Sequence, residues 1–136
     1  MDTKQVIVMR KDLNMRKGKM CAQAAHSAIW ALLKAARVDR SENGKMITHT
    51  IQVHEDCDLP LDHWLLGNYK KICVSVNGVD ALQDVFLKAT AQGLPCHIQW
   101  DDGLTEFKGV QTVTCCAIGP GPSDLIDAIT GHLPLL

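Results

Sequence analysis

The sequence predicts an α/β fold, a single three-layer α/β/α sandwich with a mixed four-stranded sheet. Runs of β-branched and apolar residues alternate with helical segments, which is typical of a largely parallel sheet covered on both faces. The last two strands are joined by a loop and should pair antiparallel. With 46% hydrophobic and 21% charged residues, the 136-residue chain has the composition of one globular domain with a real core.

The first half begins with a predicted strand at residues 6–10 and a turn at 12–15. Seven alanines favour a helix from residue 17 or 18 to about 37. Its apolar face runs through Met20, Ala24, Ala28, Ala31 and Ala35, with Ser27 beside them. We interpret residues 41–66 as a peripheral, acidic excursion that contains one alternating strand-like stretch at 46–53 and a short helical turn at 61–66.

The second half predicts a strand at residues 71–76, a helix at 79–92 that Gly93 ends, and a strand at 95–100. A further strand follows at 110–118. We expect the Gly-Pro-Gly-Pro sequence at 119–122 to break that strand, and Ser123 to cap a short helix at 124–130. The expected element order therefore alternates strands and helices, with a strand pair near the end.

Six cysteines without a C-x-x-C pair, three of them (Cys73, Cys115 and Cys116) in strand-like apolar runs, predict small buried thiols in a reducing compartment. We expect no membrane span, no secretory signal and a cytoplasmic location. No phosphate-loop, dinucleotide or nucleophile-elbow motif is present in the sequence. The candidate zinc ligands of the excursion fit no zinc-finger spacing, so we expect no metal. They are His49, His54, Cys57 and His63.

The charge is unevenly distributed along the chain. Residues 1–40 hold nine Lys and Arg against three Asp and Glu, whereas residues 41–136 hold five against twelve. A cationic turn before the first helix suits a polyanion such as RNA, because helix N-termini attract phosphate. The candidate phosphate-binding residues are Arg10, Lys11, Arg16 and Lys17.

Two groups of polar residues could carry chemistry. Lys19, Gln23 and His26 share one face of the first helix, and imidazole is a suitable acid or base near neutral pH. The alternative for His26 is a core histidine bonded to backbone. The second group follows the third predicted core strand, where α/β sheets place ligand sites, although Asp-Asp-Gly is also an ordinary turn sequence. It comprises Asp101 and Thr105, together with Thr112 and Thr114 on the next predicted strand.

Together these motifs resemble the type 2 (archaeal/eukaryotic-type) peptidyl-tRNA hydrolase family. The resemblance rests on residues 11–26 (KDLNMRKGKMCAQAAH), on DDGLT at 101–105, on TVT at 112–114 and on IGPGP at 118–122. It covers about three-quarters of the chain. It implies a compact α/β/α domain that hydrolyses the ester between peptide and tRNA without metal or organic cofactor, and it suggests a homodimer.

Matched residue by residue, the resemblance implies a catalytic set of Lys19, His26, Asp101 and Thr105, with Gln23, Thr112 and Thr114 contacting substrate. Either Asp101, or His26 held by Asp101, would activate water, and Lys19 would stabilise the oxyanion. The chain departs from the family pattern in its long 41–66 segment, in Asp102, and in the Cys115-Cys116-Ala117 stretch. Two alternatives stay open: a non-catalytic RNA- or protein-binding module, and an adaptor that docks a partner through residues 41–66.

Overall fold

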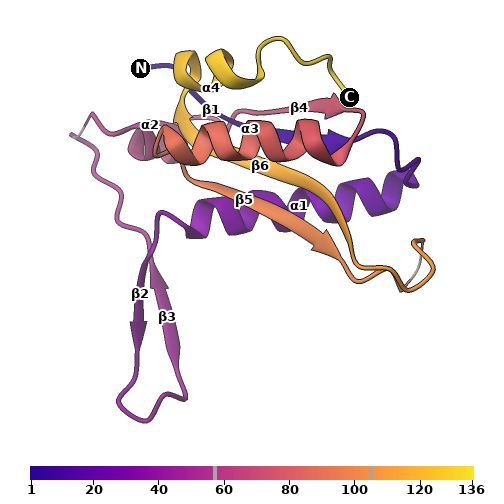
Figure 1. Ribbon diagram of the computed structural model, residues 1–136. Helices are drawn as coiled ribbons and strands as arrows, with labels where there is room; N and C mark the ends of the chain where they lie inside the picture. The colour runs from indigo at the N-terminus through magenta and orange to yellow at the C-terminus, as the bar shows by residue number, and fades with distance from the viewer. Residues whose placement is uncertain (57, 105) are drawn as a thin grey trace.

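A four-stranded mixed sheet forms the centre of the computed structural model, which describes residues 1–56, 58–104 and 106–136 (Figure 1). The strands lie in the order β4-β1-β6-β5. Their bounds are β1 (Thr3–Arg10), β4 (Lys71–Val76), β5 (Cys96–Asp101) and β6 (Thr112–Pro122). The mixed sheet is confirmed. The expectation of a largely parallel sheet is wrong: β1 and β4 are parallel, but β6 runs antiparallel to both β1 and β5.

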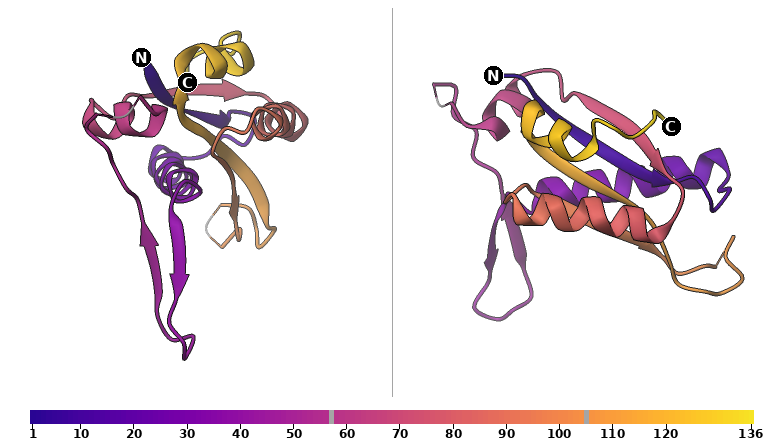
Figure 2. Two further views of the ribbon diagram at one scale, coloured as in Figure 1. Left: turned by 90° about the vertical axis from the view of Figure 1, so that its left-hand side faces the viewer. Right: turned by 45° about the horizontal axis from the view of Figure 1, so that its top comes forward.

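Helices cover both faces of the sheet, so the α/β/α arrangement is confirmed (Figure 2). α1 (Lys17–Leu33) and α2 (Pro60–Leu66) lie on one face, and α3 (Val79–Ala91) and α4 (Ser123–Thr130) lie on the other. Alternate residues of β1 point to opposite faces of the sheet and pack into two separate hydrophobic cores. Val6 and Val8 pack with α3 and α4, whereas Ile7 and Met9 pack with α1.

α1 is shorter than the sequence predicts. Its buried residues include Ala28 and Ala31, as expected from the apolar face. The regular helix ends at Leu33, and Ala35 and Ala36 then donate backbone hydrogen bonds to carbonyls three residues back, which tightens the last turn. The alanines favour helix, but the chain must leave here to begin the next strand.

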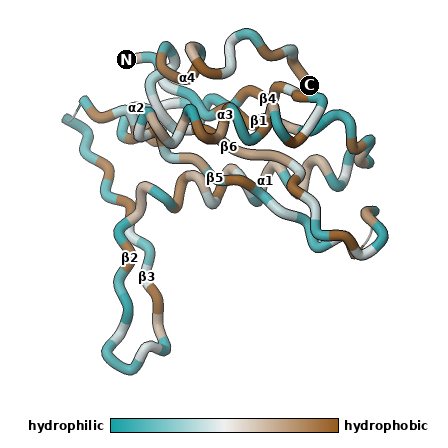
Figure 3. Tube along the Cα trace, in the orientation of Figure 1, coloured by the Kyte–Doolittle hydropathy of each residue, from teal (hydrophilic) through white to brown (hydrophobic). Residues whose placement is uncertain are grey.

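The segment interpreted as an excursion has two different parts. β2 (Arg37–Arg40) and β3 (Ile47–Thr50) form an antiparallel hairpin that projects from the body of the domain, and most of its tip is hydrophilic (Figure 3). β3 confirms the alternating stretch, whereas the sequence analysis missed β2. α2 instead packs into the domain: Trp64 is only 3% exposed, and its indole Nε1 donates to the Lys70 carbonyl at 3.0 Å.

β6 does not break at residues 119–122, which corrects the sequence interpretation. The strand continues to Pro122, opposite Thr3 of β1. Prolines are tolerated there because β5 begins at Cys96, opposite Ile118, so this end of β6 has a strand on one side only. Ser123 is the first residue of α4 rather than its cap, since the N-cap position is Pro122.

The cysteines of the described residues are free thiols. Cys115 and Cys116 are buried, and this burial raises the pKa of both thiols. Cys73 is exposed, contrary to expectation. Within the part of the chain that the structure describes, no helix is both long enough and apolar enough to cross a membrane.

Candidate active site

An ion pair joins the first turn of α1 to the end of β5. Lys19 Nζ donates to Asp101 Oδ1 at 2.8 Å, and the two side chains are only 16% and 11% exposed. The other oxygen, Asp101 Oδ2, accepts from the Gly103 backbone N–H at 2.9 Å. The hydrogen bond from Lys19, followed by that from Gly103, holds the pKa of Asp101 below its ordinary value despite partial burial. Asp101 is therefore ionised at neutral pH.

The turn after β5 depends on a glycine. Gly103 has a φ of +81°, and a Cβ placed there would lie 2.4 Å from the Val110 carbonyl oxygen. Gly103 also accepts a hydrogen bond from the Gly109 N–H at 2.8 Å, which closes the loop. A larger residue would push the loop away from Asp101, because positive φ and close backbone approach both require glycine.

A second contact lies one turn further along α1. Thr114 Oγ1 donates to Gln23 Oε1 at 2.6 Å, and both residues are buried. Gln99 of β5 pairs with Cys115 of β6, and the next residue, Trp100, pairs with Val113. Thr114 is therefore an extra residue in β6 and forms a β-bulge. Strict alternation from Cys116 would aim Thr114 at α3. The bulge turns its hydroxyl toward α1 instead.

His26 is exposed, which contradicts the alternative of a core histidine. It lies seven residues after Lys19, about 10 Å along the helix axis. Both oxygens of Asp101 are engaged by Lys19 and Gly103, and within the described ranges no hydrogen bond joins Asp101 to His26. The structure therefore brings Lys19 and Asp101 together but does not join His26 to them.

The cationic turn contains two kinds of side chain. Arg10 is engaged: its guanidinium bonds Asp12 at 2.7 Å and the Val113 carbonyl at 3.0 Å. The hydrogen bond from Arg10 lowers the pKa of the Asp12 carboxyl. Lys11, Arg16 and Lys17 are exposed. These three, rather than Arg10, are available to a polyanion.

The remaining predicted residues differ in what the structure shows of them. Thr112 donates its hydroxyl to the Val110 carbonyl at 2.9 Å. Thr105 lies outside the described residues, as does the candidate zinc ligand Cys57. In the described ranges, no three His, Cys, Asp or Glu side chains are grouped to hold a metal ion.

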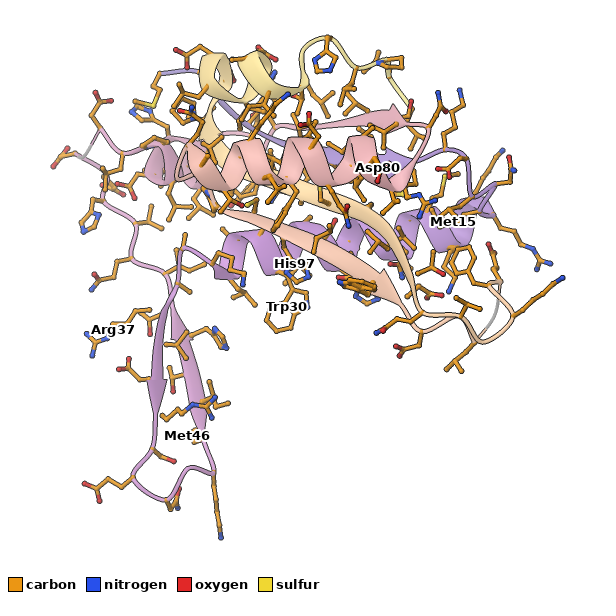
Figure 4. All side chains as sticks on the ribbon, in the orientation of Figure 1. Met15, Trp30, Arg37, Met46, Asp80 and His97 are labelled. Atoms are coloured by element: carbon orange, nitrogen blue, oxygen red, sulfur yellow. The ribbon has the colours of Figure 1, made fainter. Side chains whose placement is uncertain are left out.

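The sequence analysis missed several residues beside this site. The Arg16 backbone N–H at the start of α1 donates to Glu106 Oε2 at 3.3 Å. Trp30 of α1 stacks on His97 of β5, with ring centroids 5.7 Å apart (Figure 4). A signal for this pair was present. Trp30 continues the helical spacing of Lys19 and His26, and His97 alternates with Asp101 along β5.

A family model described as Peptidyl-tRNA hydrolase PTH2 matches residues 3–136. A protein of Methanocaldococcus jannaschii named peptidyl-tRNA hydrolase is 41% identical, over 98% of this chain and 99% of its own length. One of Metallosphaera sedula with the same name is 40% identical over 98% and 99%.

A solved structure shares the fold at low sequence identity. It is an Agrobacterium protein described as of unknown function, 12% identical, with a TM-score of 0.54 and coverage of 100% of this chain and 98% of that one. The family match over nearly the whole length agrees with the motifs that meet between α1 and β5. This chain belongs to the peptidyl-tRNA hydrolase PTH2 family.

Proposed function

We propose that this protein hydrolyses the ester that links a peptide to the 3′ end of tRNA, which releases the tRNA for reuse. Family membership gives the reaction class. The observation that carries the proposal within the molecule is the Lys19–Asp101 ion pair at 2.8 Å, next to a turn that only glycine fits. Taking two charges out of water costs free energy, and charged groups held in this way cluster at functional sites. The pair therefore supports an active site where the family motifs meet.

The chemistry requires an oriented water and a donor for the developing oxyanion. Asp101 is ionised, so its carboxylate can accept a hydrogen bond from the attacking water. Lys19 supplies the positive charge that stabilises the oxyanion of the tetrahedral intermediate. Thr105 and Thr112 would contact the ester or the terminal ribose. As the water oxygen bonds to the carbonyl carbon, Asp101 takes a proton from it. Collapse of the intermediate then breaks the ester C–O bond, and that proton passes from Asp101 to the departing ribose oxygen.

His26 takes a different part in this proposal from the one that the family resemblance suggested. It is exposed on the same helical stripe, about 10 Å along the helix axis from Lys19, and in the described ranges no hydrogen bond joins it to Asp101. We assign His26 to the substrate path, where it contacts the bound strand, rather than to a dyad with Asp101. Gln23 and Thr114, which are buried against each other, position α1 on the sheet.

The exposed cations at the start of α1 would bind the phosphate backbone without reading sequence. Arg16 is 89% exposed at its side chain, and its cation is close to one carboxylate, Glu106, at 3.9 Å. Lys11 and Lys17 are exposed beside it. Each lost phosphate contact should reduce the salt dependence of binding by about one unit of slope in log K against log salt.

The decisive experiment compares release of the acyl group from N-blocked aminoacyl-tRNA and from free aminoacyl-tRNA. The proposal expects cleavage of the blocked substrate only. Asp101→Asn and Lys19→Met should each lower kcat by about a hundredfold or more, the size typical for loss of a general base and of one oxyanion donor, respectively. Arg16→Ala should raise KM with little effect on kcat.

A matched control is the Lys88–Asp84 pair of α3, which has the same 2.8 Å separation but is exposed on the opposite face of the sheet. Lys88→Met and Asp84→Asn should keep wild-type turnover. If the wild-type protein binds tRNA yet cleaves neither substrate, the non-catalytic binding module replaces the hydrolase proposal.

Three further expectations, from the sequence and from the family resemblance, stay predictions. They are a homodimer, a cytoplasmic location, and activity without metal or organic cofactor. Sedimentation equilibrium measures the first, and cell fractionation measures the second. Turnover after exhaustive dialysis against a chelator measures the third.

A further inference from the structure

The aromatic pair Trp30–His97 continues the line of the candidate site. On α1, the residues Lys19, Gln23, His26 and Trp30 follow one another at helical spacing, and β5 lies alongside with Asp101 near Lys19 and His97 near Trp30. The helix and the strand therefore run antiparallel, and two pairs join them. Eleven residues of helix place Trp30 about 16 Å from Lys19 along the axis.

The two rings are stacked, and Trp30 is open to solvent whereas His97 is half-buried. The ring planes are inclined by 25°, and Trp30 remains 48% exposed although its large apolar ring would gain from burial. Figure 4 shows the two rings together below the ribbon, on the outer side of α1 and β5. An exposed tryptophan held in place by a neighbouring ring offers a rigid flat surface to a ligand.

Charge beside the pair favours a nucleic acid over a peptide. Lys34, exposed at the end of α1, lies close enough to His97 to lower its pKa, together with the larger effect of burial. The imidazole is therefore neutral at pH 7 and adds no charge to the stack. Within the described ranges, neither Lys34 nor Lys17 at the opposite end of α1 forms an ion pair. Free cations thus flank the stripe, about 25 Å apart along the helix.

We propose that the Trp30–His97 pair is a stacking platform for an unpaired base of the RNA substrate, upstream of the terminal nucleotide, with Lys34 on the adjoining phosphate. Bases stack on aromatic side chains irrespective of sequence, while cations hold the backbone. The platform rests on the proposed function for the identity of the RNA. It fixes the direction of the strand: the 3′ ester lies at Lys19 and Asp101, and the preceding nucleotides run along α1 toward the hairpin.

The test measures binding separately from hydrolysis. The probe is a fluorescent RNA hairpin with an unpaired 3′ tail, compared with the same hairpin ending blunt and with a tail that carries abasic sites. Trp30→Ala should weaken binding of the tailed RNA about fivefold or more, the lower end for loss of one stacked base. Trp30→Phe should retain most of the affinity. Abasic tails should bind wild type and Trp30→Ala equally.

Trp100 provides a matched control. It is 49% exposed, nearly the same as Trp30, but it lies on β5 one residue before Asp101 and so faces the other side of the strand. Trp100→Ala should leave affinity for the tailed RNA within about twofold. Circular dichroism and urea unfolding should show that all three variants keep the fold.

Several results would overturn the platform. One is equal affinity of wild type for blunt and tailed RNA, and another is equal loss of both on Trp30→Ala. A third is a Trp30 effect that appears only in KM for substrates with an aromatic peptide, because the surface would then bind the peptide. If wild type hydrolyses the substrate and Trp30→Ala binds the tailed RNA as tightly as wild type does, the platform is refuted and the hydrolase proposal stands. If Trp30 contributes to tail binding but the protein does not hydrolyse the substrate, the platform stands and the hydrolase proposal is refuted.

Discussion

Lys19 and Asp101 are 82 residues apart in the chain, yet their side chains meet at 2.8 Å where α1 begins and β5 ends. This pair connects the most informative helical motif of the sequence to the turn that follows the edge strand. It supplies a carboxylate that stays ionised and a cation held next to it.

The ion pair should make a stability contribution that depends on pH. The pKa of Asp101 is lowered from 3.8 in the folded protein, chiefly by Lys19, so the contribution is present above pH 3.8 and is lost as pH falls through the lowered value. Lys19→Met should reduce the free energy of unfolding by about 1–3 kcal/mol at pH 7. Urea unfolding should show this difference shrinking toward pH 2. Lys88→Met, in an exposed pair, should change stability by less than about 0.5 kcal/mol at either pH.

The buried hydrogen bond between Thr114 and Gln23 should be a second source of stability. Thr114→Val removes the donor and leaves Gln23 Oε1 without it in a buried position, at a cost of about 1–3 kcal/mol. Thr112→Val, which removes the hydroxyl that donates to the exposed Val110 carbonyl, should cost less than about 0.5 kcal/mol. A Gln23→Leu/Thr114→Val double variant should lose less than the sum of the singles. Strict additivity in urea unfolding would contradict a direct interaction.

Alanine substitutions at Gly103 and Gly109 distinguish the cost of a steric clash from the cost of a positive φ. Both glycines have positive φ, +81° and +77°, but a Cβ on Gly103 would lie 2.4 Å from the Val110 oxygen, whereas one on Gly109 would meet none of the described residues within 4 Å. Gly109→Ala should cost about 1 kcal/mol for the left-handed conformation alone. Gly103→Ala should cost more and should also lower kcat, since the Gly103 N–H bonds Asp101. Equal effects of the two variants on kcat would refute the role assigned to this turn.

The hairpin and α2 should differ sharply in their tolerance of change. Arg37 and Thr50 are paired at the base of the hairpin, so an Asn-Gly turn can replace residues 38–49 between them. We expect this shortened chain to keep its free energy of unfolding within about 0.5 kcal/mol, because the hairpin strands are exposed throughout. Trp64→Ala in α2 should cost about 3–5 kcal/mol.

The same shortened chain bears on partner docking. The adaptor alternative placed a partner on residues 41–66, and it requires the hairpin or α2 for binding but not for turnover. If removal of the hairpin abolishes hydrolysis of blocked aminoacyl-tRNA while the fold persists, the hairpin takes part in substrate binding instead. Steady-state kinetics of the shortened chain decides between these two roles.

Local sequence patterns predicted the helices and strands well where the apolar residues repeat with a clear helical or strand period. Residues 71–76 were predicted as a strand and match β4 in both bounds, and the helix at 79–92 overruns α3 by one residue. The stripe of Lys19 and Gln23 also follows from spacing alone. The residue pattern also named Asp101 and Thr114 as candidates, but it did not give the helical residue that each one contacts, because no local pattern states which strand lies against a helix.

Long-range pairing explains what the sequence analysis missed. The central position of β1 between β4 and β6 depends on contacts across most of the chain, so alternation of strands and helices wrongly favoured a largely parallel sheet. Pro120 and Pro122 read as a strand break, although a strand with one neighbour tolerates proline. The stacking of Trp30 on His97 likewise depends on the antiparallel course of α1 and β5.

The extra residue at Thr114 has a consequence for how this chain can vary in length. Deleting a single amino acid between 112 and 115 would restore regular pairing with β5 and rotate a hydroxyl from the α1 side to the α3 side. The buried Gln23 side chain would then lose this hydrogen-bond donor. Functional variants of this sequence should therefore carry no insertions or deletions in this stretch. Such changes should accumulate in the β2–β3 hairpin, because its length does not affect the pairing of the four-stranded sheet.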